Sequence, residues 1–193
     1  MSLAPTPSQT VGPFYGYALP FAKGGDIAPT GHPDTVTVHG YVYDGAGLPI
    51  PDAIVEVWQP APDGSRTGAP GSLRRDPVKG EIIGRDGVAF TGFGRIATDA
   101  DGHYVIRTLP PGGAPYLSLI VFARGLLHHL YTRAYLPELT DPTADPLLAS
   151  LSPERRDTLL ATPDTGSAPG VLRFDIRLQY DGVHEETVFL AFD

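Results

Sequence analysis

Glycine and proline interrupt this sequence at short intervals, and their spacing restricts the fold more than any other feature. The chain of 193 residues contains 23 glycines and 21 prolines, scattered between short apolar segments. Proline breaks helices and glycine favours turns. The large number of both residues therefore argues against a helical protein. We therefore expect many short strands joined by turns.

The segments between these turns alternate apolar and polar residues with a period of two, which is typical of strands. In one of them, Val55 and Val57 alternate with Ile54, Glu56 and Trp58. The expected strands cover residues 35–43, 53–59, 95–98, 103–109, 116–123, 126–136, 173–179 and 187–192. About eight short strands at roughly ten-residue spacing predict an all-β fold, an antiparallel β sandwich.

Helix is expected only in an insertion between strands. Asp145 and Ser152 each place a capping residue directly before a proline, which favours the start of a helix. We expect two short helices, around residues 146–150 and 153–160.

The domain organisation is expected to be simple. No boundary is visible, so residues 1–193 are predicted to form one domain, with 1–34 as an N-terminal arm because they lack a sustained period. Residues 60–92 form an unusually long Gly/Arg/Pro-rich loop, and such loops are commonly functional or partner-contacting. The turn at 99–102 predicts a hairpin between the strands on either side of it.

Composition excludes several classes of function. The formal net charge is -8 and the pI is about 5.1, so a nucleic-acid partner is not expected. No apolar run is long enough for a membrane span, and the first residues lack the basic and apolar regions of a secretory signal. The absence of cysteine excludes disulfides and thiolate chemistry and fits a reducing compartment, so we expect a cytoplasmic protein.

The residues alone predict no self-sufficient active site. None of the six histidines forms a chelating motif, and His128 and His129 would point to opposite faces of a strand, so no metal site is expected. No nucleophile motif or phosphate-binding glycine loop is present, and no catalytic residue is expected. Five aspartates lie in short segments that contain glycine or proline and are interpreted as turn residues: Asp44, Asp52, Asp63, Asp99 and Asp101.

The remaining conspicuous side chains have structural interpretations. Trp58 and the pair Tyr41 and Tyr43 are expected to pack in the core and on the strands. Arg133 lies in an alternating strand, where a surface or interface salt bridge is the simplest prediction.

Five segments, in order, resemble the family of intradiol ring-cleaving dioxygenases, and within it the alpha chains of the αβ members. Among them, 38–64 resembles a signature hairpin that ends in E-x-W-Q, and 93–112 resembles the segment that leads to a P-G turn. The five segments are 6–14, 38–64, 93–112, 117–136 and 173–193. The resemblance implies a prealbumin-like sandwich.

The resemblance also implies where iron should be held. Catalytic chains of the family bind Fe(III) with two tyrosinates and two histidines, and the histidines form H-x-H on the strand after the P-G turn. Here Tyr116 and Ser118 occupy those two positions, and 60–92 contains no tyrosine. The resemblance therefore implies no metal ligand on this chain, with Fe(III) carried by a beta subunit of the same fold in an αβ hetero-oligomer.

Two segments are implied to bind substrate. The T-x-G-P-aromatic motif corresponds to Thr10, Gly12, Pro13 and Phe14, where the family often has tyrosine at the last position. F-A-R-G places Arg124 at the family's active-site arginine, and a guanidinium suits an anionic carboxylate. A solvent-facing turn is the alternative for Arg124, and a purely structural interface role is the alternative for the motif.

The implied reaction belongs to the complex. The beta subunit would cleave a catechol acid, 3,4-dihydroxybenzoate, with O2 to 3-carboxy-cis,cis-muconate, while this chain alone would be inactive. A non-enzymatic, transthyretin-like β-sandwich module for binding or scaffolding is the alternative. A homo-oligomeric enzyme with unusual ligands is a third hypothesis, which the missing H-x-H opposes.

Overall fold

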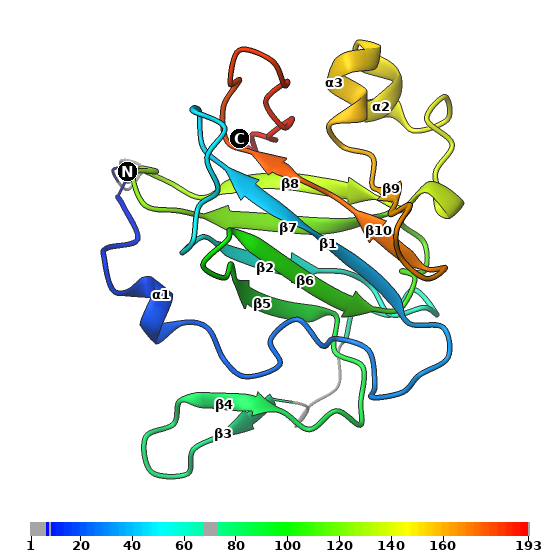
Figure 1. Cartoon of the computed structure of the whole chain (residues 1–193). Coiled ribbons are helices and arrows are strands. Elements are labelled where there is room, and N and C mark those ends of the chain that lie inside the picture. Colours follow the sequence, from blue (N-terminus) through cyan, green and yellow to red (C-terminus); the bar gives the residue numbers. More distant parts are fainter. Residues whose placement is uncertain (1–6, 8, 68–72, 193) are drawn as a thin grey trace, which may run out of the picture.

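Two β-sheets face each other across an apolar layer in the computed structural model, which describes residues 7, 9–67 and 73–192 (Figure 1). The first sheet contains β1 (Val36–Tyr43), β6 (His103–Thr108), β9 (Thr162–Pro163), β10 (Val171–Arg173) and β11 (Ile176–Arg177). The second contains, in spatial order, β5 (Phe93–Ala97), β2 (Ile54–Trp58), β7 (Tyr116–Phe122) and β8 (Leu130–Tyr135). The expected β sandwich is confirmed.

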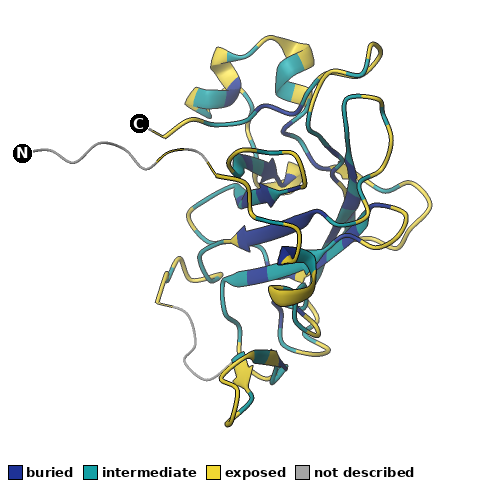
Figure 2. Cartoon of the chain, turned by 90° about the vertical axis from the view of Figure 1, so that its left-hand side faces the viewer, coloured by how far each residue is buried: buried dark blue, intermediate teal, exposed yellow. Residues whose placement is uncertain are grey.

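The core is built from the inward-facing side chains of both sheets. Burying an apolar side chain contributes about 1.5–3 kcal/mol, so these positions dominate the stability of the fold. The layer includes Val38, Val42, Val55, Val57, Tyr104, Ile106, Leu117, Leu119 and Val121, all at most 1% exposed. Figure 2 shows buried residues on the strands and exposed ones mainly on the connections.

The first sheet is mixed rather than purely antiparallel. β6 runs antiparallel to β1, whereas β10 and β11 both run parallel to it. Between β10 and β11 the backbone of Phe174 comes so close to Gly40 that a Cβ atom there would collide with the Phe174 carbonyl oxygen. Glycine is therefore required at the point where the edge of β1 changes partner.

The turn at 99–102 does not close a hairpin, so that prediction is wrong. β5 pairs with β2 in the second sheet, and β6 pairs with β1 in the first. The turn itself forms, because the Asp99 carboxylate accepts hydrogen bonds from the backbone N–H groups of Asp101 and His103. It carries the chain from one sheet to the other, and the same change of sheet separates β1 from β2.

The prediction of a core position for Trp58 is also wrong. Its side chain is 49% exposed and packs against the Phe93 ring in a tilted arrangement, with ring centroids 4.6 Å apart. Tyr41 and Tyr43 are half-buried and stack on each other on the outer face of β1. Alternation predicts two faces for a strand but does not say which one becomes the inside.

Four elements differ from the sequence-based expectation. The strand expected at 173–179 is replaced by two short strands, β10 and β11, which pair with β1 on either side of Gly40. The strand expected at 126–136 begins at Leu130, because the chain turns at Gly125, whose φ of +87° is left-handed. Residues 187–192 form a single isolated bridge, between Leu190 and Tyr131, instead of a strand. The long loop contains an unexpected hairpin of β3 (Leu73–Arg75) and β4 (Ile82–Arg85).

The helices are short and lie outside the sheets. They are α1 (Tyr15–Ala18), the 3₁₀ helix η1 (Pro137–Leu139), α2 (Pro146–Ser150) and α3 (Pro153–Asp157). α2 matches its prediction, α3 ends three residues early, and α1 was not expected. α2 and α3 cover a smaller apolar cluster of Tyr135, Leu148, Leu159 and Val188.

The described part of the arm is ordered against the sheets. The backbone N–H groups of Ile27 and Ala28 donate to the Arg107 carbonyl oxygen, and Ile27 is 1% exposed. The division into one domain with an arm at 1–34 stays a prediction. No helix within the described ranges is long and apolar enough to cross a membrane.

Candidate functional site

The N-terminal arm meets the turn between β7 and β8 at a junction formed by Tyr15, Asp52 and Arg124. Tyr15 is the first residue of α1 and is 4% exposed. Its hydroxyl donates to the Asp52 carbonyl oxygen at 2.5 Å, and the backbone of Arg124 hydrogen-bonds to the same hydroxyl. Three segments that are distant in sequence are thus fixed at one edge of the sandwich (Figure 1).

Arg124 presents its charge at the surface of this junction. Its side chain is 66% exposed, and its Nε atom forms an ion pair with the Oδ2 atom of Asp52, whose side chain is 26% exposed. Among the described residues, neither Nη atom of Arg124 has a hydrogen-bond partner. One edge of the guanidinium is therefore held and the other is available to a ligand.

The four predicted residues of the N-terminal motif directly precede Tyr15. Thr10, Pro13 and Phe14 are exposed, Phe14 to 74%, and Gly12 is half-buried with a left-handed φ of +81°. The structure brings this motif and Arg124 to the same edge. Tyr15 and Asp52 connect the motif to Arg124. Neither residue was predicted from the sequence as part of the site, because Tyr15 lies just after the motif and Asp52 was interpreted as a turn residue.

The electrostatics of the junction favour binding rather than proton transfer. Burial raises the pKa of the Tyr15 hydroxyl, and the nearby Asp52 charge raises it further. The hydroxyl therefore stays protonated near neutral pH and keeps its hydrogen bond to the Asp52 carbonyl oxygen. The junction therefore offers the permanent positive charge of Arg124 to an anion.

The two ligand-strand positions, Tyr116 and Ser118, lie at the other end of β7. Ser118 is opposite Arg133 in the register of β7 and β8. The guanidinium of Arg133 lies 4.2 Å from the centroid of the Tyr116 ring, and its Nη1 atom donates to the Tyr135 hydroxyl at 3.2 Å. Within the described ranges Arg133 has no acidic partner and stacks on an aromatic ring, so the surface salt bridge is not formed within this chain, whereas an interface salt bridge stays a prediction.

These groups do not fit a ferric ion. A serine hydroxyl is a poor ligand for Fe(III), and the positive charge of Arg133 over the Tyr116 ring repels a metal cation there. Among the residues that the structure describes, no group of three or more His, Cys, Asp or Glu side chains is arranged to hold a metal ion.

A pair of histidines that sequence analysis missed lies on the outer face of the first sheet. The Nδ1 atom of His39 is 3.1 Å from the Nε2 atom of His103, and the Nε2 atom of His39 is 3.3 Å from the Asp164 carboxylate. The Ser167 hydroxyl donates to Asp164 at 2.5 Å, and this bond, followed by His39, lowers the pKa of Asp164. Only the pairing of β1 with β6 brings these histidines together, so no local spacing could predict it.

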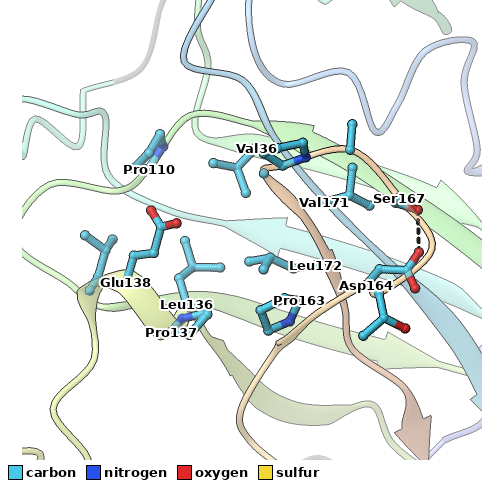
Figure 3. A pocket seen from close by; sticks show the side chains of 15 residues that line it. Val36, Pro110, Leu136, Pro137, Glu138, Pro163, Asp164, Ser167, Val171 and Leu172 are labelled. Carbon is cyan, nitrogen blue, oxygen red and sulfur yellow. Dashed lines mark hydrogen bonds between the residues drawn. The ribbon is translucent and has the colours of Figure 1, made fainter.

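A pocket of about 620 Å³ opens at the end of the sandwich that lies away from Arg124 (Figure 3). Its walls are mainly apolar, with Leu136, Pro163 and Leu172 among them, whereas Glu138 and Asp164 supply carboxylates. Acidic side chains repel an anionic ligand. The pocket is thus chemically unlike the junction at Arg124, which is the candidate site.

Comparison with known proteins agrees with this geometry. The profile of the family described as Dioxygenase matches residues 11–118. The protocatechuate 3,4-dioxygenase alpha chain of Burkholderia cepacia is 37% identical, over 97% of this chain and 98% of that protein. The alpha chain of Pseudomonas putida is 34% identical, over 98% of both.

More distant relatives share the fold. The protocatechuate 3,4-dioxygenase beta chain of Burkholderia cepacia is 28% identical, over 76% of this chain and 65% of that protein. The dioxygenase domain of a dioxygenase and carbohydrate-binding fusion from Streptomyces sp. SirexAA-E has a TM-score of 0.58 at 26% identity, over 92% of this chain and 99% of that domain. The chain therefore belongs to the intradiol ring-cleaving dioxygenase family, in the group that contains the protocatechuate 3,4-dioxygenase alpha chains.

Proposed function

We propose that this chain is the alpha subunit of an αβ protocatechuate 3,4-dioxygenase and completes the substrate pocket of a beta subunit. The observation that carries the proposal is the distance along the chain between Ser118, one of the two ligand-strand positions, and Arg124. Ser118 and Arg124 are six residues apart, about 20 Å in an extended strand. A carboxylate on Arg124 is thus too far from this chain's own ligand-strand positions, so Arg124 serves the active site of another chain.

In the proposed complex, the beta subunit holds Fe(III), which supplies the chemistry with O2 that opens the ring of 3,4-dihydroxybenzoate to 3-carboxy-cis,cis-muconate. This chain binds and orients the substrate. Arg124 forms charge-assisted hydrogen bonds to the substrate carboxylate through its free Nη atoms. Thr10, Gly12, Pro13 and Phe14 line the same edge of the pocket, next to the arginine. The cysteine-free composition supports a cytoplasmic location.

Two sets of observations support this assignment. The alpha chains of two bacteria match this chain over nearly their full length, and a beta chain matches it more distantly. The position of Arg133 over Tyr116 supports a chain that does not bind iron itself.

Co-expression with the beta-type chain of the same organism tests the proposal. We expect a stable hetero-oligomer that contains iron in proportion to its beta chains and consumes O2 with 3,4-dihydroxybenzoate. This chain expressed alone should contain no stoichiometric iron and should not consume O2 with 3,4-dihydroxybenzoate. Stoichiometric iron with tyrosinate absorption in the isolated chain would refute the proposal, and failure to bind any beta-type chain would favour the non-enzymatic module.

A further inference from the structure

Asp52 lies at the end of a well-fixed piece of backbone. It directly precedes Ala53, which is fully buried and whose carbonyl oxygen accepts the Thr98 N–H at 2.8 Å. The Asp52 side chain is itself only 26% exposed. A carboxylate at this place therefore has little freedom to move, and whatever it binds is held relative to the core.

The contact between Asp52 and Arg124 selects one edge of the guanidinium. A guanidinium can bind a carboxylate through Nε and one Nη atom or through both Nη atoms. Asp52 occupies Nε, so the edge with two Nη atoms remains for a second carboxylate. An arginine that is two-thirds exposed would otherwise sample many rotamers, and ordering it on binding would reduce affinity.

Tyr15 extends this arrangement to the N-terminal arm. Its ring is buried, and its hydroxyl contacts the backbone of both Asp52 and Arg124. The next residue, Gly16, lies close to Asp52 as well, since a Cβ atom there would be 3.9 Å from the Asp52 Cβ atom. The arm, the start of β2 and the β7–β8 turn thus share one set of contacts.

We propose that Asp52 is a positioning residue for substrate recognition: it holds the Nε edge of Arg124 so that both Nη groups face the substrate carboxylate, while Tyr15 ties this pair to the arm. The inference rests on the proposed function and adds the residues that set its specificity. Asp52 also carries a negative charge that repels an anionic substrate. Positioning and repulsion predict opposite effects of removing Asp52, and this difference makes the inference testable.

The test uses the αβ complex and compares 3,4-dihydroxybenzoate with catechol, which lacks the carboxylate. Asp52→Ala should raise KM for 3,4-dihydroxybenzoate by about tenfold, with a much smaller effect on kcat and on KM for catechol. Asp52→Asn keeps an oxygen acceptor of the same length, so the increase should be several-fold smaller. In the double variant Asp52→Ala/Arg124→Ala, KM should equal that of Arg124→Ala alone, because Asp52 acts through Arg124.

Asp26→Ala is the matched control, because Asp26 forms an exposed ion pair with Arg107 elsewhere, at 3.0 Å. Asp52→Ser, whose side chain is too short to reach Nε, replaces the alanine variant if that variant does not fold. Additive effects in the double variant, equal losses with both substrates, or a lower KM in both Asp52 variants would overturn the inference. A wild-type complex that is inactive with 3,4-dihydroxybenzoate would instead refute the proposed function.

Discussion

The ion pair of Arg124 adds little to the stability of the fold, which fits the recognition role that we propose for this residue. Arg124 forms an ion pair with Asp52, and the Arg124 side chain is 66% exposed. Exposed ion pairs contribute about 0–1 kcal/mol to folding. The same exposure leaves two Nη atoms accessible to a ligand. The energetic role of the residue is therefore expected in binding, where a second carboxylate and a neighbouring chain would exclude water from the guanidinium.

Replacing Arg124 with alanine should weaken binding of the carboxylated substrate selectively. Loss of a charge-assisted hydrogen bond costs about 1.5–3 kcal/mol, which corresponds to a KM for 3,4-dihydroxybenzoate raised by at least about tenfold. Steady-state kinetics of the αβ complex measure the effect, with catechol as the second substrate and Arg107→Ala as the matched control. Equal increases in KM for both substrates would mean that the arginine does not contact the carboxylate.

Asp181 supplies a second residue-scale prediction, which concerns acid stability. Its carboxylate accepts the backbone N–H groups of His184 and Val183 and the His184 side chain, and these bonds hold its pKa well below the usual range. Because the folded-state pKa lies below the unfolded value of about 3.9, the ionised Asp181 stabilises the folded protein above that pH. This stabilisation is lost progressively as the pH falls toward the folded-state pKa. Urea unfolding between pH 6 and 3 should therefore show a smaller acid loss for Asp181→Asn than for wild type. An unchanged acid loss would exclude Asp181 as a contributor.

At the scale of elements, local signals determined the short helices. The Asp145 carboxylate accepts the N–H groups of Leu147 at 2.9 Å and Leu148 at 3.1 Å, and it also accepts the Tyr135 hydroxyl. Ser152 caps α3 with one longer bond, to the Arg155 N–H at 3.4 Å. Leu148, which α2 places in the smaller apolar cluster, is fully buried.

The two caps should differ in their contribution to stability. Asp145→Ala leaves two backbone donors and the Tyr135 hydroxyl without this acceptor, so it should cost about 1–2 kcal/mol of unfolding free energy. Ser152→Ala should cost about 0.5 kcal/mol, because its single bond is long. Urea denaturation of the isolated chain and of both variants measures the difference. Equal costs would mean that the cap of α2 has no special role.

The features that sequence analysis predicted are those that depend on neighbouring residues. Strand periodicity, the turn at 99–102 and the caps at Asp145 and Ser152 all act within a few residues. The pairing of β5 with β2, the outward face of Trp58 and the contact of His39 with His103 depend on which strands come together, and a period of two does not specify that. The connection from the arm to Arg124 is equally non-local, so Tyr15 and Asp52 were found only in the structure.

At the scale of the whole molecule, the two ends of β7 carry different groups of side chains. Arg124 and the part of the arm around Tyr15 lie at one end, whereas Tyr116, Ser118 and Arg133 lie at the other. If two chains of this fold pair so that each presents its arm to the other's ligand strand, the complex has an approximate two-fold axis. Under the proposed function, this chain would then contribute Arg124 to the iron-bearing site of the beta subunit, and the arm of the beta subunit would cover the corresponding end of this chain.

Trp58 reports whether this arrangement forms. It is the only tryptophan in the sequence, is 49% exposed, and lines surface pockets together with Tyr116, Ser118 and Arg133. Association should cover it, so its fluorescence should shift to shorter wavelength and become harder to quench with acrylamide. Subtracting the spectrum of a complex that carries Trp58→Phe isolates its emission from that of the beta chain. Unchanged quenching in an assembled, active complex would show that the partner's arm leaves this end open, and the pairing would then be asymmetric.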